Sequence, residues 1–203
     1  MFEPLTDRPA RRTGQLAVGL FGYGASLALM VRARLGLDPW DVFHQGLGRV
    51  VHHSIGTVII VVSLVVLLAW IPLRQRPGVG TLANAVLVGV ATNAVLAVLP
   101  SPHAMAARIG LLIAGVFGNA AATGLYIGAG LGPGPRDGLM TGLAARGISI
   151  RVARTCVEAS VLAVGFFLGG TIGVGTVLYA ASIGPLVHIA LPRLALAPRR
   201  SPT

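Results

Sequence analysis

Long apolar stretches separated by short polar segments run along the whole chain. The apolar stretches cover residues 14–31, 54–73, 81–99, 108–130, 152–170 and 174–191. Each approaches the roughly 20 residues that an α-helix needs to cross a ~30 Å hydrocarbon core. The pattern therefore predicts an all-α polytopic membrane protein with about six transmembrane helices.

Two polar segments interrupt this pattern, one after the first apolar stretch and one after the fourth. Residues 38–53 are too polar for a helix that faces lipid. Asp38 is a favourable N-cap and Pro39 suits the first helical position, so we expect a short helix to begin there. We expect a second short helix to begin at Pro135. Because proline cannot donate a backbone hydrogen bond, each segment is predicted to be a broken helix.

The chain repeats itself. Residues 19–47 align without a gap with residues 115–143, and 12 of these 29 positions are identical. Both copies end in Leu-Gly-x-x-Pro-x-Asp followed by Gly-Leu, with Asp41 in the first copy and Asp137 in the second. A Gly-Val-Gly-Thr block also occurs once in each half. A duplication of this length predicts two repeated halves in a membrane protein.

The repeat divides the chain into four parts. We expect three-helix repeats at residues 14–100 and 108–192, flanked by tails at residues 1–13 and 193–203. Each half then contains three spans and one short helix. An odd number of spans makes the second half enter the membrane from the other side, so the repeats are predicted to be inverted. If the short helices also spanned, the halves would be parallel.

The arginines predict the orientation. With the N-terminus inside, the cytoplasmic segments hold twelve of the sixteen arginines and the opposite segments hold four. Cytoplasmic loops of membrane proteins carry an excess of basic residues. The distribution therefore places both termini in the cytoplasm and the protein in the bacterial cytoplasmic membrane.

Composition supports the membrane class and excludes several others. The chain is 54% hydrophobic and 11% charged, with a mean hydropathy of +0.80, whereas a soluble domain needs a more charged surface. The net charge of +10 comes from arginines in short segments between apolar stretches, which suits anionic lipid rather than nucleic acid. Cys156 is the single cysteine, so we expect no disulfide framework and no cysteine-based metal site.

The two proline-aspartate segments are the principal candidates for a substrate site or gate. Pro39 and Pro135 begin short helices whose N-termini carry a partial positive charge, suited to a polar or anionic substrate group. Asp41 and Asp137 follow two residues later. These acids have an equally simple structural role, because an acid in the first turn stabilises a helix by about 0.3–1 kcal/mol.

Three other positions carry polar chemistry. Trp40 stands in the first copy where Arg136 stands in the second, and an interfacial anchor is the default role of such a tryptophan. Glu158 is the only acid well inside a predicted span. Because buried carboxylates in membranes are costly, it is a candidate for proton coupling. Pairing with Arg154, one turn earlier, is the alternative.

Polar residues also occupy equivalent positions in the two halves. Tyr23 aligns with Asn119, and Asn84 aligns with Tyr179. Such residues line a shared path between the halves, or else form interhelical hydrogen bonds worth about 0.6 kcal/mol each. We find no phosphate loop, nucleophile elbow or zinc-binding pattern. The sequence thus predicts no enzyme, no catalytic residue, no cofactor and no metal.

The segment from Asp38 to Phe43, its second copy from Pro135 to Leu139, and the repeated Gly-Val-Gly-Thr resemble the YczE family of bacterial membrane proteins, which is loosely grouped with YitT and YyaS. The resemblance covers residues 14–192. It implies an inner-membrane protein, in a family sometimes suggested to contain transporters or exporters associated with secondary metabolism. It implies no catalytic residues, and Arg136 departs from the Pro-Trp-Asp form of the first copy.

The leading expectation is a secondary transporter that exports a small organic molecule, with alternating access about a midplane site between the repeats. A non-transporting scaffold or accessory subunit of a biosynthetic or transport complex is the alternative. The expected partners are membrane lipids and a small-molecule substrate of unknown identity, with no nucleic acid; a homo-oligomer is compatible with the sequence.

Overall fold

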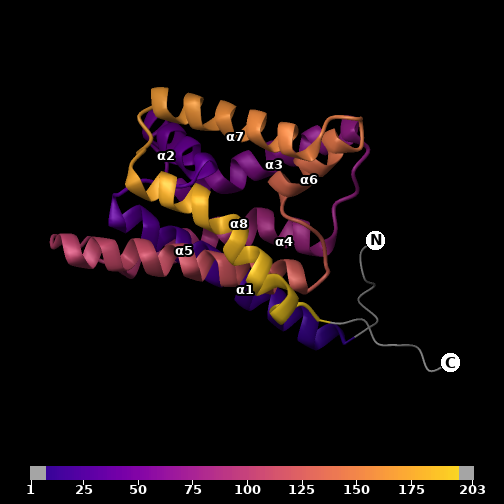
Figure 1. The fold of residues 1–203 in the computed structure, drawn as a ribbon, viewed down its shortest axis with the longest axis horizontal. Coiled ribbons are helices and arrows are strands. Elements are labelled where there is room, and N and C mark those ends of the chain that lie inside the picture. The colour runs from indigo at the N-terminus through magenta and orange to yellow at the C-terminus, as the bar shows by residue number, and fades with distance from the viewer. Residues whose placement is uncertain (1–7, 197–203) are drawn as a thin grey trace.

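The computed structural model describes residues 8–196, and every regular element within that range is an α-helix (Figure 1). In chain order the eight helices are α1 (Pro9–Ala33), α2 (Pro39–Val51), α3 (Ile55–Leu73), α4 (Val79–Val98), α5 (Met105–Gly128), α6 (Pro135–Ala144), α7 (Ile150–Phe167) and α8 (Val174–Leu194). The all-α prediction is confirmed for the described residues.

Both short helices begin where the sequence predicts. The side chain of Asp38 caps α2 and accepts a hydrogen bond from the backbone N–H of Asp41 at 2.8 Å, with Pro39 in the first turn. The cap satisfies one of the backbone donors that the first turn of a helix leaves free. Pro135 likewise opens α6, with Gly134 as its N-cap.

Two predicted boundaries are wrong. Helix α1 begins at Pro9, inside the segment expected to be a tail, because Pro9 fits the first helical position and Arg12 folds back to donate to the carbonyl of Ala129 at 2.8 Å. Helix α8 continues through Pro192, the last residue of the predicted second repeat, to Leu194. Membrane helices tolerate internal proline where neighbouring groups satisfy the freed backbone. The rest of the predicted tails lies largely outside the described residues.

Five of the described helices are long and apolar enough to cross a membrane: α1, α3, α4, α5 and α8. Helix α7 is 18 residues long but carries Arg151, Arg154 and Glu158. The short helices α2 and α6 have 13 and 10 residues. The chain is therefore a multi-pass membrane protein.

Helices α1 and α5 form the most extensive helix–helix contact among the described residues and run antiparallel. Arg12 near the start of α1 bonds to Ala129 after the end of α5, and Arg108 near the start of α5 donates to the carbonyl of Ala33 at 2.7 Å. The helices approach closely because glycines lie where they cross. A Cβ atom on Gly19 would lie 2.7 Å from the backbone nitrogen of Tyr126, closer than real Cβ contacts allow.

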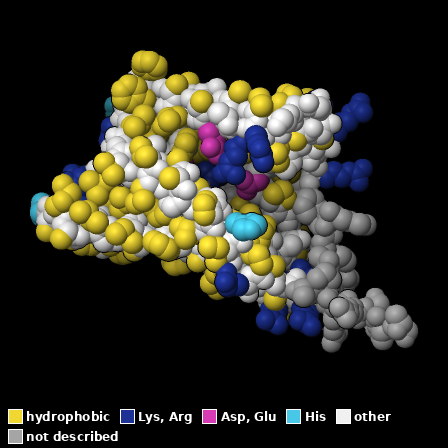
Figure 2. Space-filling model, viewed as in Figure 1, with side chains coloured by type: hydrophobic (Ala, Val, Ile, Leu, Met, Phe, Trp, Pro, Cys, Tyr) yellow, Lys and Arg dark blue, Asp and Glu magenta, His cyan; other side chains and the backbone are white. Residues whose placement is uncertain are grey.

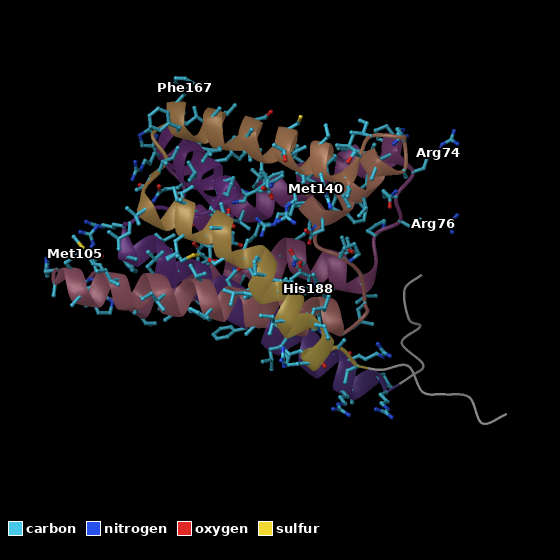
Figure 3. All side chains as sticks on the ribbon, in the orientation of Figure 1. Arg74, Arg76, Met105, Met140, Phe167 and His188 are labelled. Atoms are coloured by element: carbon cyan, nitrogen blue, oxygen red, sulfur yellow. The ribbon has the colours of Figure 1, made fainter. Side chains whose placement is uncertain are left out.

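The ends of the helices define two opposite ends of the molecule. In Figure 3, Arg74 and Arg76 lie at one end, and Met105 and Phe167 lie at the other. Helix α3 thus ends, and helix α5 begins, on different sides. The helices between them run roughly along the long axis of the molecule (Figure 1).

The short helices pack against distant parts of the chain. Helix α2 packs mainly on α7, and α6 packs mainly on α3. The turns before them have matching glycines, Gly36 at φ +114° and Gly132 at φ +126°, a region that glycine enters without a steric penalty. These turns are held by equivalent backbone bonds: Gly175 donates to Leu35 at 2.7 Å, and Gly80 donates to Leu131 at 2.8 Å.

The outer helices of the molecule pack unequally. Helices α3 and α4 pack closely, and a Cβ atom on Gly56 would lie 2.2 Å from the carbonyl oxygen of Gly89. Helices α7 and α8 make almost no contact with each other. This difference leaves an opening between α7 and α8 that has no equivalent between α3 and α4.

Candidate functional site

Two cavities meet where the short helices begin. The larger has a volume of about 340 Å³ and lies among α5, α6, α7 and α8. The smaller, of about 50 Å³, lies toward α3 and α4. Four residues line both cavities: Trp40, Tyr126, Arg136 and Asp137. The first turns of α2 and α6 therefore form much of the boundary between the two spaces.

Every acidic side chain of residues 8–196 lines one of these cavities, although the chain as a whole is strongly basic. They are Asp38, Asp41, Asp137 and Glu158. Figure 2 looks onto the open side, where acidic and basic side chains gather in a hollow on a face that is otherwise largely hydrophobic. The acidic side chains of the described residues are thus concentrated around the two cavities.

Arg136 joins the two broken segments. Its Nη1 atom lies 3.3 Å from Oδ2 of Asp38, which is 1% exposed. Its Nη2 atom donates to the hydroxyl of Tyr23, and the guanidinium lies 5.7 Å from the centre of the same ring. An ion pair, a hydrogen bond and a cation–π contact therefore fix this side chain between α1, α2 and α6.

Asp41 pairs with a histidine on its own helix. Oδ1 of Asp41 lies 3.1 Å from Nδ1 of His44, and both side chains are buried. The other carboxylate oxygen, Oδ2, is buried with no hydrogen-bond partner among the described residues, as is the indole Nε1 of Trp40. Buried polar atoms are rarely left unsatisfied, so these two atoms mark where a ligand or a water molecule would be held.

Asp137 has a different environment. Its Oδ2 atom accepts a hydrogen bond from the hydroxyl of Tyr126 at 2.8 Å. Among the described residues no arginine or histidine pairs with it. The equivalent aspartates of the two repeated motifs thus differ in chemistry: Asp41 contacts a histidine and Asp137 contacts a phenol.

Tyr179 and Asn119 bond to each other. The tyrosine hydroxyl and the amide Oδ1 lie 3.0 Å apart, and Asn119 is fully buried with its Nδ2 atom lacking a partner among residues 8–196. Tyr179 lines the larger cavity, whereas Asn84, its repeat counterpart, lines the smaller one. The pair links α5 to α8 beside the site.

Glu158 accepts from Nε of Arg154 at 2.9 Å, one helical turn earlier. Both side chains line the larger cavity, and both are partly exposed, 32% for the glutamate and 58% for the arginine. The pair thus lies at the open side of the cavity. Ser63, at the repeat position equivalent to Glu158, lines the smaller cavity.

The structure brings the residues predicted from the sequence together. All but one line a cavity: Tyr23, Pro39, Trp40, Asp41, Asn84, Pro135, Arg136, Asp137, Glu158 and Tyr179. Asn119 reaches the site through Tyr179. Their functional roles remain predictions. Residues 8–196 contain no group of three His, Cys, Asp or Glu side chains that could hold a metal ion.

Three residues of the site were not singled out from the sequence as site residues. Asp38 was expected only to cap α2, and His44 and Tyr126 carried no expectation. The signal for His44 was available, because residues three apart on a helix share a face and Asp41 precedes it by three positions. Tyr126 has no such local signal, since its contact with Asp137 depends on how the turn after α5 folds back.

Comparison with known proteins places this chain among proteins of unknown activity. A family of unknown function, DUF6198, matches residues 10–192. An uncharacterized protein of Haemophilus influenzae is 38% identical, over 90% of this chain and 83% of the relative. The uncharacterized membrane protein YczE of Bacillus subtilis is 33% identical, over 86% of this chain and 81% of its own.

A third relative is more distant. The uncharacterized protein YyaS of Bacillus subtilis is 25% identical, over 86% of this chain and 90% of its own. The resemblance to the YczE group is confirmed by these matches. No solved structure matches the chain.

Proposed function

The chain belongs to the DUF6198 family and is a multi-pass membrane protein, and on that premise we propose that it is a secondary transporter that exports a small organic molecule across the bacterial cytoplasmic membrane. Its substrate site is the pair of cavities between the two broken segments. Both termini face the cytoplasm.

The proposed architecture has six spans in two inverted repeats, α1–α4 and α5–α8, with α7 as the sixth span. The support is a set of contacts that occur twice. Gly80 donates to Leu131, and Gly175 donates to Leu35. The two bonds are equivalent, because Gly175 is the repeat counterpart of Gly80 and Leu35 is the counterpart of Leu131. Many secondary transporters have such repeats, with the substrate site near the bilayer midplane.

One observation carries the functional proposal. All four acidic side chains of residues 8–196, together with Arg136, converge on cavities inside an apolar molecule. Charges at membrane depth are costly and occur mainly where they face a polar pathway for substrates or protons. A purely structural role would not require a cavity of about 340 Å³ beside them.

The unequal packing of the outer helices supports alternating access. Helices α3 and α4 pack closely on each other beside the smaller cavity, whereas α7 and α8, beside the larger cavity, make almost no contact. In the proposed cycle the two halves exchange these arrangements around Arg136 and Asp137. Asp41 and Asp137 bind or gate the substrate, Pro39 and Pro135 break the helices around it, and Glu158 couples transport to proton movement.

Flux in proteoliposomes tests the proposal. The purified protein is reconstituted and offered candidate compounds under proton and sodium gradients. We expect gradient-driven uptake or release that falls at least about tenfold in Asp41→Asn and Asp137→Asn, because each substitution removes a charge that lines the site. Arg151→Gln, an exposed change on α7 outside both cavities, is the matched control.

Two results would argue for the scaffold alternative. One is the absence of flux and of binding for every compound under every gradient. The other is co-purification of a stoichiometric partner protein together with full biological activity of the Asp41→Asn and Asp137→Asn variants.

A further inference from the structure

The acidic residues of the larger cavity are not equally neutralised. Asp38 lies 3.3 Å from Arg136, and Glu158 lies 2.9 Å from Arg154. Asp137 has only the hydroxyl of Tyr126, at 2.8 Å. Two of the three carboxylates in this cavity therefore form ion pairs, whereas Asp137 interacts with Arg136 only beyond ion-pair distance and has no arginine or histidine of the described residues within 4.0 Å.

Arg136, which lines the larger cavity, already has partners within the protein. Arg136 contacts Asp38 through one terminal nitrogen and Tyr23 through the other, and it stacks over the ring of Tyr23 at 5.7 Å. An anionic ligand would have to displace an ion pair whose carboxylate is 1% exposed. Because a buried charge that loses its partner is strongly unfavourable, the cavity is poorly suited to an anion.

A second unsatisfied acceptor lies next to the cavity. Asp41 is 3% exposed, and its Oδ2 atom has no hydrogen-bond partner among the described residues. It lines the smaller cavity, which shares Trp40 and Asp137 with the larger one. The region therefore holds two carboxylate groups with capacity to accept from a ligand that donates hydrogen bonds.

The remaining lining is aromatic and apolar. Trp40, Tyr126 and Tyr179 line the larger cavity, and the faces of such rings attract cations. The lining also includes the apolar side chains of Ile127, Met140 and Ile183; Met140 lies between α7 and α8 in the view of Figure 3. A volume of about 340 Å³ falls in the range of sites for small organic ligands.

We propose that the larger cavity binds a small amphipathic organic cation, an amine or ammonium compound whose charged end lies against Asp137 and whose apolar body lies against α5 and α8. The inference rests on the proposed function in one respect, namely that this ligand is the transported substrate. Binding itself requires only the cavity and its charges.

A series of probes with a common phenylethyl group tests the ligand class. The probes are phenethylammonium, phenylalanine, 2-phenylethanol and 3-phenylpropionate, whose polar ends are cationic, zwitterionic, neutral and anionic. Their affinities are measured by titration calorimetry with the full-length protein in detergent micelles at neutral pH. We expect the cation to bind most tightly, by at least about tenfold over the alcohol and the anion, since tenfold corresponds to only about 1.4 kcal/mol.

Substitutions at Asp137 test whether its carboxylate binds the charged end of the ligand. Asp137→Asn should reduce the affinity for phenethylammonium at least about tenfold and leave that for 2-phenylethanol nearly unchanged, because only the charge is removed. Asp137→Glu should restore most of the preference for the cation. Arg151→Gln changes the net charge by one unit away from the cavities and should leave the charge order intact. Thermal unfolding of each variant establishes that it is folded.

Three outcomes would overturn the inference: equal affinities across the series, tighter binding of 3-phenylpropionate, or no saturable binding of the cation below roughly 10 mM. The failure of transport is a separate result. Binding of the cation without flux in proteoliposomes would support the ligand class and contradict the proposed transporter. Flux of an anionic compound, with no binding of the cation, would support the proposed transporter and contradict the ligand class.

Discussion

At the scale of single residues, two acid–arginine pairs within residues 8–196 lie in contrasting surroundings. Asp38 is 1% exposed and pairs with Arg136, whereas Glu158 and Arg154 are both partly exposed. Removing one partner of a buried pair leaves an uncompensated charge and costs about 3–5 kcal/mol. An exposed pair contributes about 0–1 kcal/mol.

We therefore expect Asp38→Asn to lower the stability of the protein by several kcal/mol, on the order of the cost of a broken buried pair, and Glu158→Gln to leave it nearly unchanged. Asparagine is also a good N-cap, so the first substitution tests the charge and not the cap of α2. Unfolding of purified protein in detergent, followed by denaturant or temperature, measures both variants. Similar losses for the two would show that burial of the Asp38 pair has no energetic consequence.

The sequence could predict residues whose role is local. Asp38 as a cap depends only on its neighbours in the chain, and it was found in that role. The partnership of Asp38 with Arg136 joins residues 98 positions apart and depends on how the two turns fold inward. Paired positions in the repeat nevertheless indicated several of the polar residues that line the two cavities, among them Tyr23, Asn84 and Tyr179.

At the scale of helices, the glycines of α1 differ in what surrounds them. A Cβ atom on Gly19 would lie 2.7 Å from the backbone nitrogen of Tyr126, whereas one on Gly14 would meet nothing within 4 Å. We expect Gly19→Ala to destabilise the protein by about 1–3 kcal/mol, because α1 and α5 must move apart. Gly14→Ala should be neutral or stabilising by up to about 1 kcal/mol, because alanine favours a helix.

Both variants replace glycine by alanine in α1. The difference between their stabilities therefore measures the effect of the contact between α1 and α5. Thermal unfolding in one detergent is sufficient to compare them. A Gly19→Ala protein as stable as Gly14→Ala would mean that the close approach of α1 and α5 does not limit packing. Gly115→Ala and Gly110→Ala in α5 provide an independent pair, since Gly115 contacts α1 and Gly110 has open space.

The starts of the two short helices were predicted correctly, because caps and prolines at Asp38 and Pro135 are local signals that act on the first turn. The start of α1 and the end of α8 were not. Helix α8 continues past Pro192, where contacts with the rest of the protein decide whether a proline interrupts a helix. The charged residues of α7 likewise obscure whether it spans.

At the scale of the whole molecule, topology is the direct test of the proposed architecture. In a Cys156→Ser background, which removes the exposed native thiol, cysteine is introduced at Arg76 or at His103, both exposed. An impermeant maleimide should label the His103→Cys protein in intact cells. It should label the Arg76→Cys protein only after permeabilisation, because the arginine-rich side is expected to face the cytoplasm.

Labelling of both positions from the same side would contradict the span between them. Labelling of Arg76→Cys alone in intact cells would reverse the proposed orientation while leaving the spans in place. The exposed thiol of Cys156 would also react with the maleimide. The Cys156→Ser protein without an introduced cysteine is therefore labelled as a blank.

The duplication was visible in the sequence, but two features of its assembly were not. The exchange of short helices, with α2 on α7 and α6 on α3, is a property of tertiary packing. Helices α3 and α4 pack tightly at Gly56 and Gly89, whereas a Cβ atom on Gly184, the repeat equivalent of Gly89, would meet nothing within 4 Å. Identity between repeats does not report such differences.

The contact between α2 and α7 has a consequence for how the protein is made. Helix α2 is polar for a membrane segment and packs mainly on a helix that begins at Ile150. Translation at roughly 5–20 residues per second delivers that partner several seconds after α2 has emerged. During this interval the nascent chain holds buried-site residues such as Asp41 and His44 without their final surroundings, so assembly must be completed late in synthesis, when the second half reaches the first.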